Sequence, residues 1–430
     1  MRVNRPFLIL GVITLVASSA AAQQPAPAAG RTVVRAARML DVESGRLLRD
    51  ARVLIERDRI LAVNPASVPA NVPVIDLGDV TLLPGFIDTH THLGGEIGAN
   101  MRLLPVTETA VDEAFHAARN ARTTALAGFT TVRDFGGSVT VALGHAVERG
   151  DVLGPRVIPS RNSLGITGGH CDVTGYAPGV LEQGVEDGVA DGPWEVVQAV
   201  RYQIKHGAQV IKTCATAGVL SMEGPVGAQQ YTDEELTAMV EEAARHGIKV
   251  AAHAHGTEGI KAAVRAGVAS IEHGSMLDDE AIALMKQRGT YLVPTSYLAD
   301  RINLEILPPP IRAKAEMVLP LAKASLRKAI AGGVKIAFGT DAAVYPHGEN
   351  AREFAVYVRA GMTPLAALRS ATVNAADLLG KADRGIIAPG KLADLVAVPG
   401  NPLEDITVTE RVQFVMLGGR VIKKNGGDAP

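Results

Sequence analysis

Cysteines, aromatic residues and net charge are all scarce in this chain, and these shortages exclude several classes of protein. Cys171 and Cys214 are the only two cysteines in 430 residues, too few for a disulfide framework, and their spacing matches no zinc motif. We expect both to be small buried side chains, with a bond between them as the less favoured alternative. A net charge of -2 offers no basic surface, so neither nucleic acid nor an anionic membrane is expected as a partner.

Long apolar runs are also scarce, and the run Phe7–Val16 is short for a membrane span. Arg2 and Arg5 precede this run, and small residues follow it up to Ala22. A charged start, an apolar centre and a small-residue site are typical of a signal peptide, here residues 1–22. A retained membrane anchor is the alternative. We therefore expect a secreted or periplasmic protein with no membrane contact after cleavage.

Short β-type runs occur at both ends of the remaining chain, after a Pro/Ala-rich leader at residues 23–31. Residues 32–84 contain runs such as ARVLIERDRILAV, and residues 385–430 contain KLADLVAV and VQFVMLGGRVIKK. Turn residues separate these runs. The pattern predicts one small β-sandwich domain that is built from both ends.

The segment between them, residues 85–384, alternates strand and helix patterns. Strands are expected at Gly85–His90, Thr130–Asp134, Arg156–Ser160, Gln209–Thr213, Lys249–His253, Ser270–His273, Tyr291–Thr295 and Lys335–Asp341. Helical patterns include Thr107–Ala127, Thr232–His246, Glu258–Ala266 and Asp278–Arg288, and Thr232 with Glu235 forms a capping box. Eight strand–helix units predict an α/β fold, a (β/α)8 TIM-like barrel. A doubly wound open sheet has a similar pattern and stays as the alternative.

Polar residues end several of these strands. His90 and His92 are separated by one residue, so on a strand they face the same way. Lys212, His253, His273 and Asp341 lie at the ends of four later strands. In a barrel those ends meet at one mouth, where such residues are typically catalytic. Converging imidazoles and a carboxylate indicate a metal site.

The segments PGFIDTHTHL, VIKTCATAG, VAAHAHG, SIEHG, FGTDAA and GIIAPGKLADLVAV resemble those of the amidohydrolase superfamily, from about residue 32 to the C-terminus. Within it, the chain is similar to metallo-dipeptidases and carboxypeptidases acting on Xaa-Pro peptides and to ochratoxin A amidohydrolases. The resemblance implies two divalent metal ions, with zinc expected and cobalt or manganese as alternatives. Their ligands would be His90, His92, Lys212, His253, His273 and Asp341. Lys212, carboxylated by CO2, would bridge both metals.

The resemblance also implies roles in catalysis. A hydroxide bridging the metals would attack the substrate carbonyl, and Asp341 would carry its proton to the leaving nitrogen. His170 and His255 would act beside it in catalysis and substrate binding, and Tyr231 would add a hydrogen bond to the substrate. Gly256 stands where superfamily members that deaminate rings carry a glutamate, which favours hydrolysis of an amide or ester.

We therefore expect an amidohydrolase that cleaves dipeptides or N-acyl amino acids next to a free carboxylate. A lactonase or phosphotriester hydrolase with the same metals is one alternative. A non-catalytic periplasmic metal- or solute-binding protein is the other. The resemblance also implies a homo-oligomer, with an octamer as one expected form.

Overall fold

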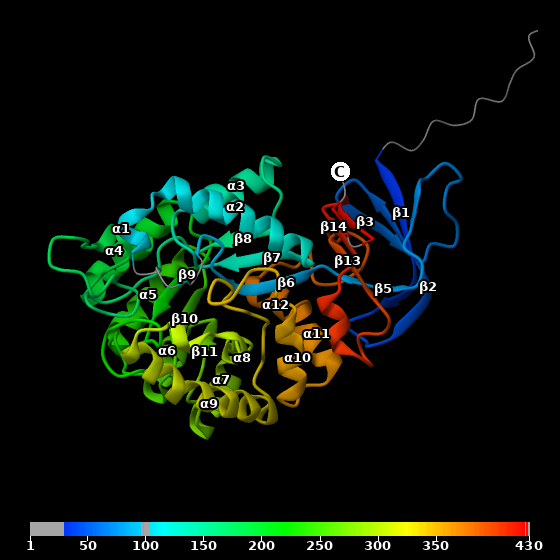
Figure 1. Ribbon diagram of the computed structural model, residues 1–430. Helices are drawn as coiled ribbons and strands as arrows, with labels where there is room; N and C mark the ends of the chain where they lie inside the picture. Colours follow the sequence, from blue (N-terminus) through cyan, green and yellow to red (C-terminus); the bar gives the residue numbers. More distant parts are fainter. Residues whose placement is uncertain (1–29, 96–97, 99–102, 426, 429–430) are drawn as a thin grey trace, which may run out of the picture.

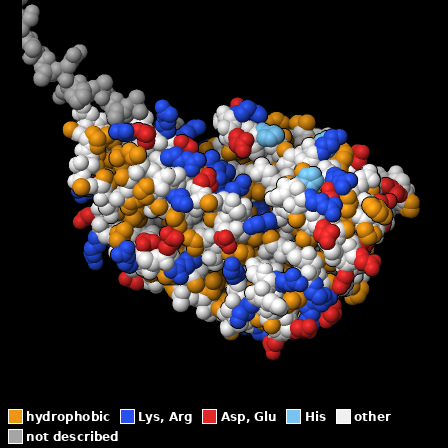
Figure 2. Space-filling view, turned by 180° about the vertical axis from the view of Figure 1, so that it is seen from behind, with side chains coloured by type: hydrophobic (Ala, Val, Ile, Leu, Met, Phe, Trp, Pro, Cys, Tyr) orange, Lys and Arg blue, Asp and Glu red, His pale blue; other side chains and the backbone are white. Residues whose placement is uncertain are grey.

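The computed structural model describes residues 30–95, 98, 103–425 and 427–428. The predicted signal peptide and nearly all of the leader therefore lie outside the described residues. Within these ranges, no helix combines the length and apolarity that a bilayer crossing requires. Basic and acidic side chains are interspersed over the face seen in Figure 2, in keeping with the net charge of -2.

Strands from both chain ends join in one sheet at one end of the molecule (Figure 1). Its strands are β1 (Arg31–Leu40), β2 (Leu47–Glu56), β3 (Arg59–Val63), β4 (Val74–Asp76), β5 (Val80–Pro84), β13 (Leu395–Pro399), β14 (Phe414–Leu417), β15 (Arg420–Lys424) and β16 (Gly427–Asp428). The order is β16-β15-β14-β13-β5-β1-β2-β3, with β4 beside β1. Antiparallel pairing of β5 with β13 joins the two ends.

This sheet folds back on itself around a core of its own. The last strand in the order, β3, returns to residues 390–393, where Ile60 donates its amide to Lys391 at 2.9 Å. The enclosed cluster contains Val53 and Leu82 from the first part of the chain and Leu395 and Phe414 from the last. The two ends therefore share one apolar core, as the sequence pattern predicts.

The middle of the chain forms a ring of parallel strands. Its regular strands are β6 (Phe86–Thr91), β7 (Phe129–Asp134), β8 (Arg156–Pro159), β9 (Ile211–Cys214), β10 (Val250–Ala254), β11 (Ser270–His273) and β12 (Tyr291–Val293). They form two sheets, β6-β7-β8 and β9-β10-β11-β12. Backbone bonds from Leu164 to Lys212 at 2.8 Å and from Gln209 to Pro159 at 2.8 Å link β8 to β9.

The eighth predicted strand, Lys335–Asp341, closes this ring without forming a regular strand. Leu292 of β12 donates to Lys335 at 2.8 Å, and Thr89 of β6 donates to Phe338 at 2.8 Å. An added Cβ at Gly339 would lie 2.2 Å from Val293, so the segment approaches its neighbour more closely than other residues allow. The segment therefore pairs at isolated points only. The closed ring is a barrel, and the open doubly wound sheet is excluded.

Helices surround the ring. The larger ones are α2 (Ala110–Leu126), α3 (Val139–Arg149), α4 (Gly192–Lys205), α5 (Asp233–Arg245), α6 (Thr257–Ala266), α7 (Asp279–Arg288), α9 (Pro309–Gly332), α10 (Arg352–Arg359), α11 (Pro364–Ser370) and α12 (Val373–Leu379). Short helices α1 (Leu104–Thr107) and α8 (Leu298–Arg301) lie in connections. The predicted capping box of Thr232 and Glu235 is present at the start of α5. Helix α2 begins later than predicted because Thr109 caps it.

Candidate metal centre and active site

A cavity of about 510 Å³ lies at the carboxyl ends of the barrel strands. The eight residues predicted as ligands or catalytic groups all line it: His90, His92, His170, Lys212, His253, His255, His273 and Asp341. They lie on β6, β9, β10 and β11 or directly after β6 and β10, in the loop after β8 and in the irregular eighth segment. Residues that are up to 251 positions apart in the sequence therefore face one space.

His90 and His92 both point their Nε2 atoms at Asp341. The distances to Asp341 Oδ1 are 3.4 Å from His90 and 3.2 Å from His92. Burial tends to raise the pKa of Asp341, but the two imidazoles outweigh it and hold the pKa well below its usual value. Asp341 is therefore a carboxylate at neutral pH, the form that binds cations and accepts protons.

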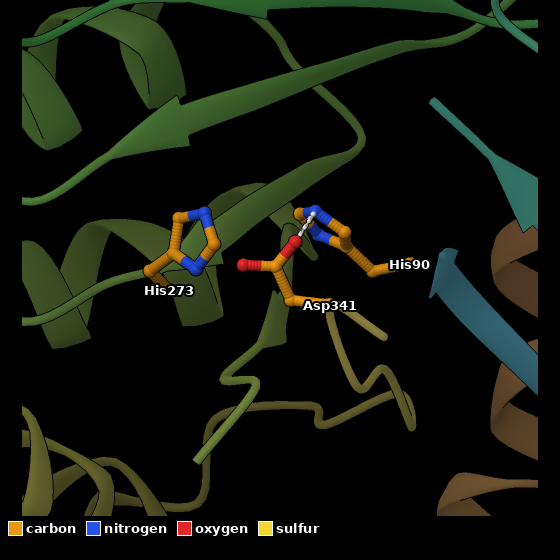
Figure 3. A group of neighbouring side chains, drawn as sticks. All are labelled: His90, His273 and Asp341. Atoms are coloured by element: carbon orange, nitrogen blue, oxygen red, sulfur yellow. Dashed lines mark ion pairs between the residues drawn. The ribbon is translucent and has the colours of Figure 1, made fainter. Parts of the chain in front are cut away.

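One group of possible ligand atoms combines His90, His273 and Asp341, whose atoms lie within 4.8 Å of one another. Figure 3 shows the Asp341 carboxylate between the two imidazoles. His253 is adjacent, with its ring centroid 4.7 Å from that of His273. The histidines of β6, β10 and β11 thus form one continuous cluster.

The imidazoles of β10 and β11 are neutral. Burial lowers the pKa of His253 and His273 well below the usual value, and it lowers the pKa of His255 to about 3. His273 Nδ1 is 2.7 Å from Thr295 Oγ1, and His255 Nδ1 is 2.7 Å from Ser275 Oγ. Partners at Nδ1 leave Nε2 for the cavity. A neutral imidazole with a fixed Nδ1 is the form that ligates metals.

Lys212 is buried among these groups, with only 4% of its surface exposed. Its Nζ lies 4.1 Å from the centroid of the Phe135 ring. Burial lowers the pKa of Lys212 to about 8, although Glu272 and Asp341 oppose the shift. Near neutral pH a fraction of this side chain is therefore an uncharged amine, which is nucleophilic.

A buried ion pair beneath His90 was not predicted from the sequence. Glu272 of β11 accepts hydrogen bonds from Arg133 Nη2 at 2.8 Å and Ser270 Oγ at 2.5 Å, and its Oε2 lies 2.7 Å from His90 Nδ1. Burial opposes ionisation of Glu272, but Arg133 and His90 lower its pKa to about 2. The carboxylate fixes the His90 ring with Nε2 toward Asp341.

Three residues at this rim have left-handed backbones although none is glycine. The φ angles are 68° at His273, 47° at Thr295 and 59° at Asp341. Such conformations cost roughly 1–3 kcal/mol each and persist where the surrounding structure enforces them. His273, Thr295 and Asp341 all line the cavity, so the unusual backbone conformations occur at residues that face it.

His170 lies in the long connection after β8, and its ring centroid is 4.2 Å from that of His253. The next residue, Cys171, forms a disulfide with Cys214 of β9. The expectation that both cysteines are unpaired is therefore wrong. The connection folds back over β9, which brings together two residues 43 positions apart. The disulfide ties the loop that carries His170 to the strand that carries Lys212.

Tyr231 does not line the cavity. It is fully buried in the main hydrophobic core, just before α5. Its hydroxyl has no hydrogen-bond partner among the described residues. This placement corrects the expectation of a Tyr231 hydroxyl facing the substrate: the aromatic ring is buried in the apolar core next to the N-cap of α5.

The outer wall of the cavity is apolar. It is formed by the connection after β9, by α8 and by α9, with Leu220, Leu298, Ile302, Val318 and Leu319 among its members. Long connections thus line the site, as is common for functional loops. An apolar wall opposite a polar floor is typical of sites for small organic ligands.

These residues fit a metal centre on several independent grounds. The imidazoles of His253 and His273 are neutral and Asp341 is ionised, as metal ligands must be. The buried His253 Nε2 has no hydrogen-bond partner among the described residues. A buried imidazole nitrogen without a partner is costly, and a cation would supply the missing contact.

Comparisons with known proteins agree with this geometry. The model of the amidohydrolase family matches residues 81–422. The ochratoxinase of Aspergillus niger is 35% identical over 422 residues, covering 89% of this chain and 85% of the relative. A crystal structure of a Xaa-Pro dipeptidase with methionine bound in its active site is 40% identical, with a TM-score of 0.87, covering 91% of this chain and 100% of that one. A prolidase complexed with N-methylphosphonate-L-proline is 35% identical, with a TM-score of 0.84, covering 92% and 100%.

Proposed function

The chain belongs to the amidohydrolase family and is a hydrolase acting on amide bonds, and from this premise we propose a more specific activity. The enzyme cleaves the amide bond next to a free C-terminal carboxylate in dipeptides or N-acyl amino acids. The observation that carries the proposal is the ring of eight strand-end and loop residues around one cavity. Xaa-Pro dipeptides and ochratoxin-like amides are the first substrates to test, because the relatives are named for them.

The proposed cofactors are two divalent ions, with zinc as the first candidate. His90 and His92 would hold one ion, His253 and His273 the other, and Asp341 and Lys212 would complete the set. Ions bound there polarise an amide carbonyl and lower the pKa of water enough for attack at neutral pH. The neutral imidazoles of His253 and His273 and the ionised Asp341 support this assignment.

Lys212 would ligate as a carbamate, because an ammonium group cannot bind a cation. Carboxylation requires an uncharged amine, which attacks CO2 and releases a proton. The lowered pKa of Lys212, about 8, supports this step because it makes the amine available near neutral pH. The product is an anion with two oxygens, so one side chain could serve two ions.

Asp341 would be the general base and then the general acid. Its carboxylate accepts the proton of the attacking water and passes it to the leaving nitrogen as the C–N bond breaks. The imidazoles of His90 and His92, 3.4 Å and 3.2 Å away, hold Asp341 in the ionised form that this role requires. His255 and His170 would bind the substrate oxygens.

The apolar wall supports a substrate with an apolar or aromatic group. Leu298, Val318 and Leu319 line the cavity away from the histidines, and burial of one such side chain contributes about 1.5–3 kcal/mol. We therefore expect dipeptides and N-acyl amino acids with bulky apolar groups to have lower KM than their glycine counterparts.

A substrate panel tests the proposal against its rivals. The zinc-loaded protein should release amino acids from Xaa-Pro dipeptides and N-aroyl amino acids, and the chelated protein should not. Lactones and aryl phosphotriesters, assayed at equal concentration, represent the lactonase and phosphotriester hydrolase alternatives. Faster turnover of those compounds than of every amide would contradict the proposed substrate class.

We also propose that the protein is exported. The sequence pattern of residues 1–22 supports a signal peptide, and the Cys171–Cys214 disulfide suits an oxidising compartment. N-terminal sequencing of the protein recovered from a secreting host should begin near Gln23. Recovery of full-length chain in the cytosol only would contradict export.

Finally, we propose a homo-oligomer. Apolar side chains are exposed where the first barrel connection meets α2, with Val111 at 63% and Phe115 at 73%, and Trp194 of α4 is 88% exposed. Such groups commonly mark protein interfaces. Light scattering should give a multiple of the mass of the processed chain, and Phe115→Glu should reduce it.

A further inference from the structure

We propose that Glu223 is a positioning residue of this active site: through Ser221 it fixes the His170 ring so that Nε2 faces the substrate. The inference rests on the proposed function for the role of His170 in substrate binding. It gives a role in the active site to Ser221 and Glu223, both in the connection after β9. Neither side chain contacts the bond that is cleaved.

The three side chains form one hydrogen-bonded chain. His170 Nδ1 lies 2.5 Å from Ser221 Oγ and 3.2 Å from Glu223 Oε1. Ser221 Oγ in turn donates to Glu223 Oε1 at 2.5 Å. The Glu223 side chain is only 6% exposed, whereas that of His170 is 20% exposed and lines the cavity. The carboxylate thus lies behind the imidazole as seen from the cavity.

This order of donors settles which nitrogen of His170 carries a proton. The Ser221 hydroxyl has one hydrogen, which points to the Glu223 carboxylate. The Ser221 oxygen therefore accepts a hydrogen bond from His170 Nδ1, so Nδ1 is the protonated nitrogen. Because the Nδ1 edge of the ring is engaged by Ser221 and Glu223, the opposite edge with Nε2 is the one presented to a substrate.

Gly218 makes room for this ring. A Cβ at Gly218 would lie 2.1 Å from His170 Cε1 and 2.3 Å from Nδ1, closer than side chains pack. The Gly218 amide also donates to Glu223 Oε1 at 2.9 Å. The same glycine therefore admits the imidazole and helps to hold the carboxylate behind it.

The backbone around both residues is anchored. Gln230 Oε1 accepts from the His170 amide at 3.1 Å, and Lys314 of α9 donates to the carbonyls of Ser221, at 3.1 Å, and Glu223. The Cys171–Cys214 disulfide fixes the residue next to His170. With both backbones held, the orientation of the ring depends on Ser221 and Glu223.

A double-mutant cycle on the zinc-loaded protein tests whether Glu223 acts through His170. We expect Glu223→Ala to raise KM about tenfold for an N-acyl amino acid, the loss of one hydrogen bond to a charged group, with kcat and zinc content little changed. His170→Ala should raise KM at least as much, and the double variant should be no worse than His170→Ala alone. Glu223→Gln keeps an oxygen acceptor for Ser221 and should retain most of the affinity. Additive losses, or an unchanged KM in Glu223→Ala, would overturn the proposal.

Two glycines of one loop provide a matched steric test. Gly218→Ala should reproduce the rise in KM because the new methyl group displaces the His170 ring. Gly224→Ala is the control, since nothing lies within 4 Å of its added Cβ. Equal effects of the two substitutions, or no effect of Gly218→Ala, would contradict the role assigned to the ring.

An activity-independent measurement separates this inference from the proposed function. In histidine labelled with nitrogen-15, the His170 resonances, identified by their absence in His170→Ala, should show a protonated, hydrogen-bonded Nδ1. Glu223→Ala should abolish that signature. A protein without amide turnover but with this signature would refute the function alone, whereas an unprotonated Nδ1 would refute the positioning.

Discussion

Replacing Glu272 by glutamine tests the buried ion pair that orients His90. The substitution preserves size but leaves the Arg133 guanidinium, with a side chain only 2% exposed, without its counter-charge. Breaking a buried pair in this way typically costs about 3–5 kcal/mol. The lowering of the Glu272 pKa from 4.5 to about 2 gives a similar value, about 3 kcal/mol. We therefore expect Glu272→Gln to lower the free energy of unfolding by about 3 kcal/mol at pH 7.

The direction of the Glu272 pKa shift determines the pH range in which the substitution destabilises the protein. Because the pKa of Glu272 is lowered in the folded protein, its stabilising contribution is complete above pH 4.5 and is lost as the pH falls toward about 2. Urea unfolding of the metal-free wild-type and variant proteins, followed by circular dichroism, should differ by a constant amount from pH 7 to pH 5. The difference should shrink below pH 4.5. Zinc affinity of the variant should also fall about 10- to 100-fold, because His90 loses its orienting partner.

Two further variants control this experiment. Arg133→Met removes the cation, so Glu272→Gln should cost much less in that background. Glu280→Gln removes an ion pair with Lys261 in which the Glu280 side chain is 73% exposed, and it should change stability by less than about 1 kcal/mol. A loss below about 1 kcal/mol in Glu272→Gln, or the same loss with and without Arg133, would refute the reasoning.

Three other predictions concern the cavity. Lys212→Ala should lose bound zinc and turnover, as metal analysis and amide assays would show; retained turnover would reject the carbamate. Asp341→Asn should lower kcat by about 10²- to 10⁴-fold if it transfers the proton, and an unchanged kcat would place that role elsewhere. Cys171→Ser should lower the free energy of unfolding by up to about 4 kcal/mol, given the 43-residue separation of the bonded cysteines, and raise KM. Identical wild-type and variant values under non-reducing conditions would contradict the role of the disulfide.

The barrel and the gathering of polar side chains at its mouth could be predicted from the sequence because both depend on local patterns. A buried parallel strand appears as a short apolar run, and the polar residue that ends it marks the mouth. Ser270–His273 is a strand with the predicted bounds, and Lys249–His253 differs from β10 by one residue at each end. The eighth segment is less regular than predicted, since its path depends on contacts with Val293 and Thr89 that the local pattern does not contain.

Features that depend on the paths of loops were missed. Cys171 meets Cys214 only because the connection after β8 folds back over β9. Tyr231 packs in the core next to the N-cap of α5. The Arg133–Glu272 pair could have been predicted from the sequence. Each of two short buried strands contains a charged residue, and a buried charge requires a partner. Pairing such residues across strands would have predicted the contact.

The sheet shared by the two chain ends has a consequence for synthesis. Strands β1 to β5 leave the ribosome before the barrel, yet four strands of the same sheet, β13 to β16, are translated after it. Until then, β5 exposes an unpaired edge and the apolar face containing Leu82 has nothing to cover it. The nascent chain must keep this edge from aggregating while the whole barrel is made, and a stop codon before residue 395 would leave it open permanently.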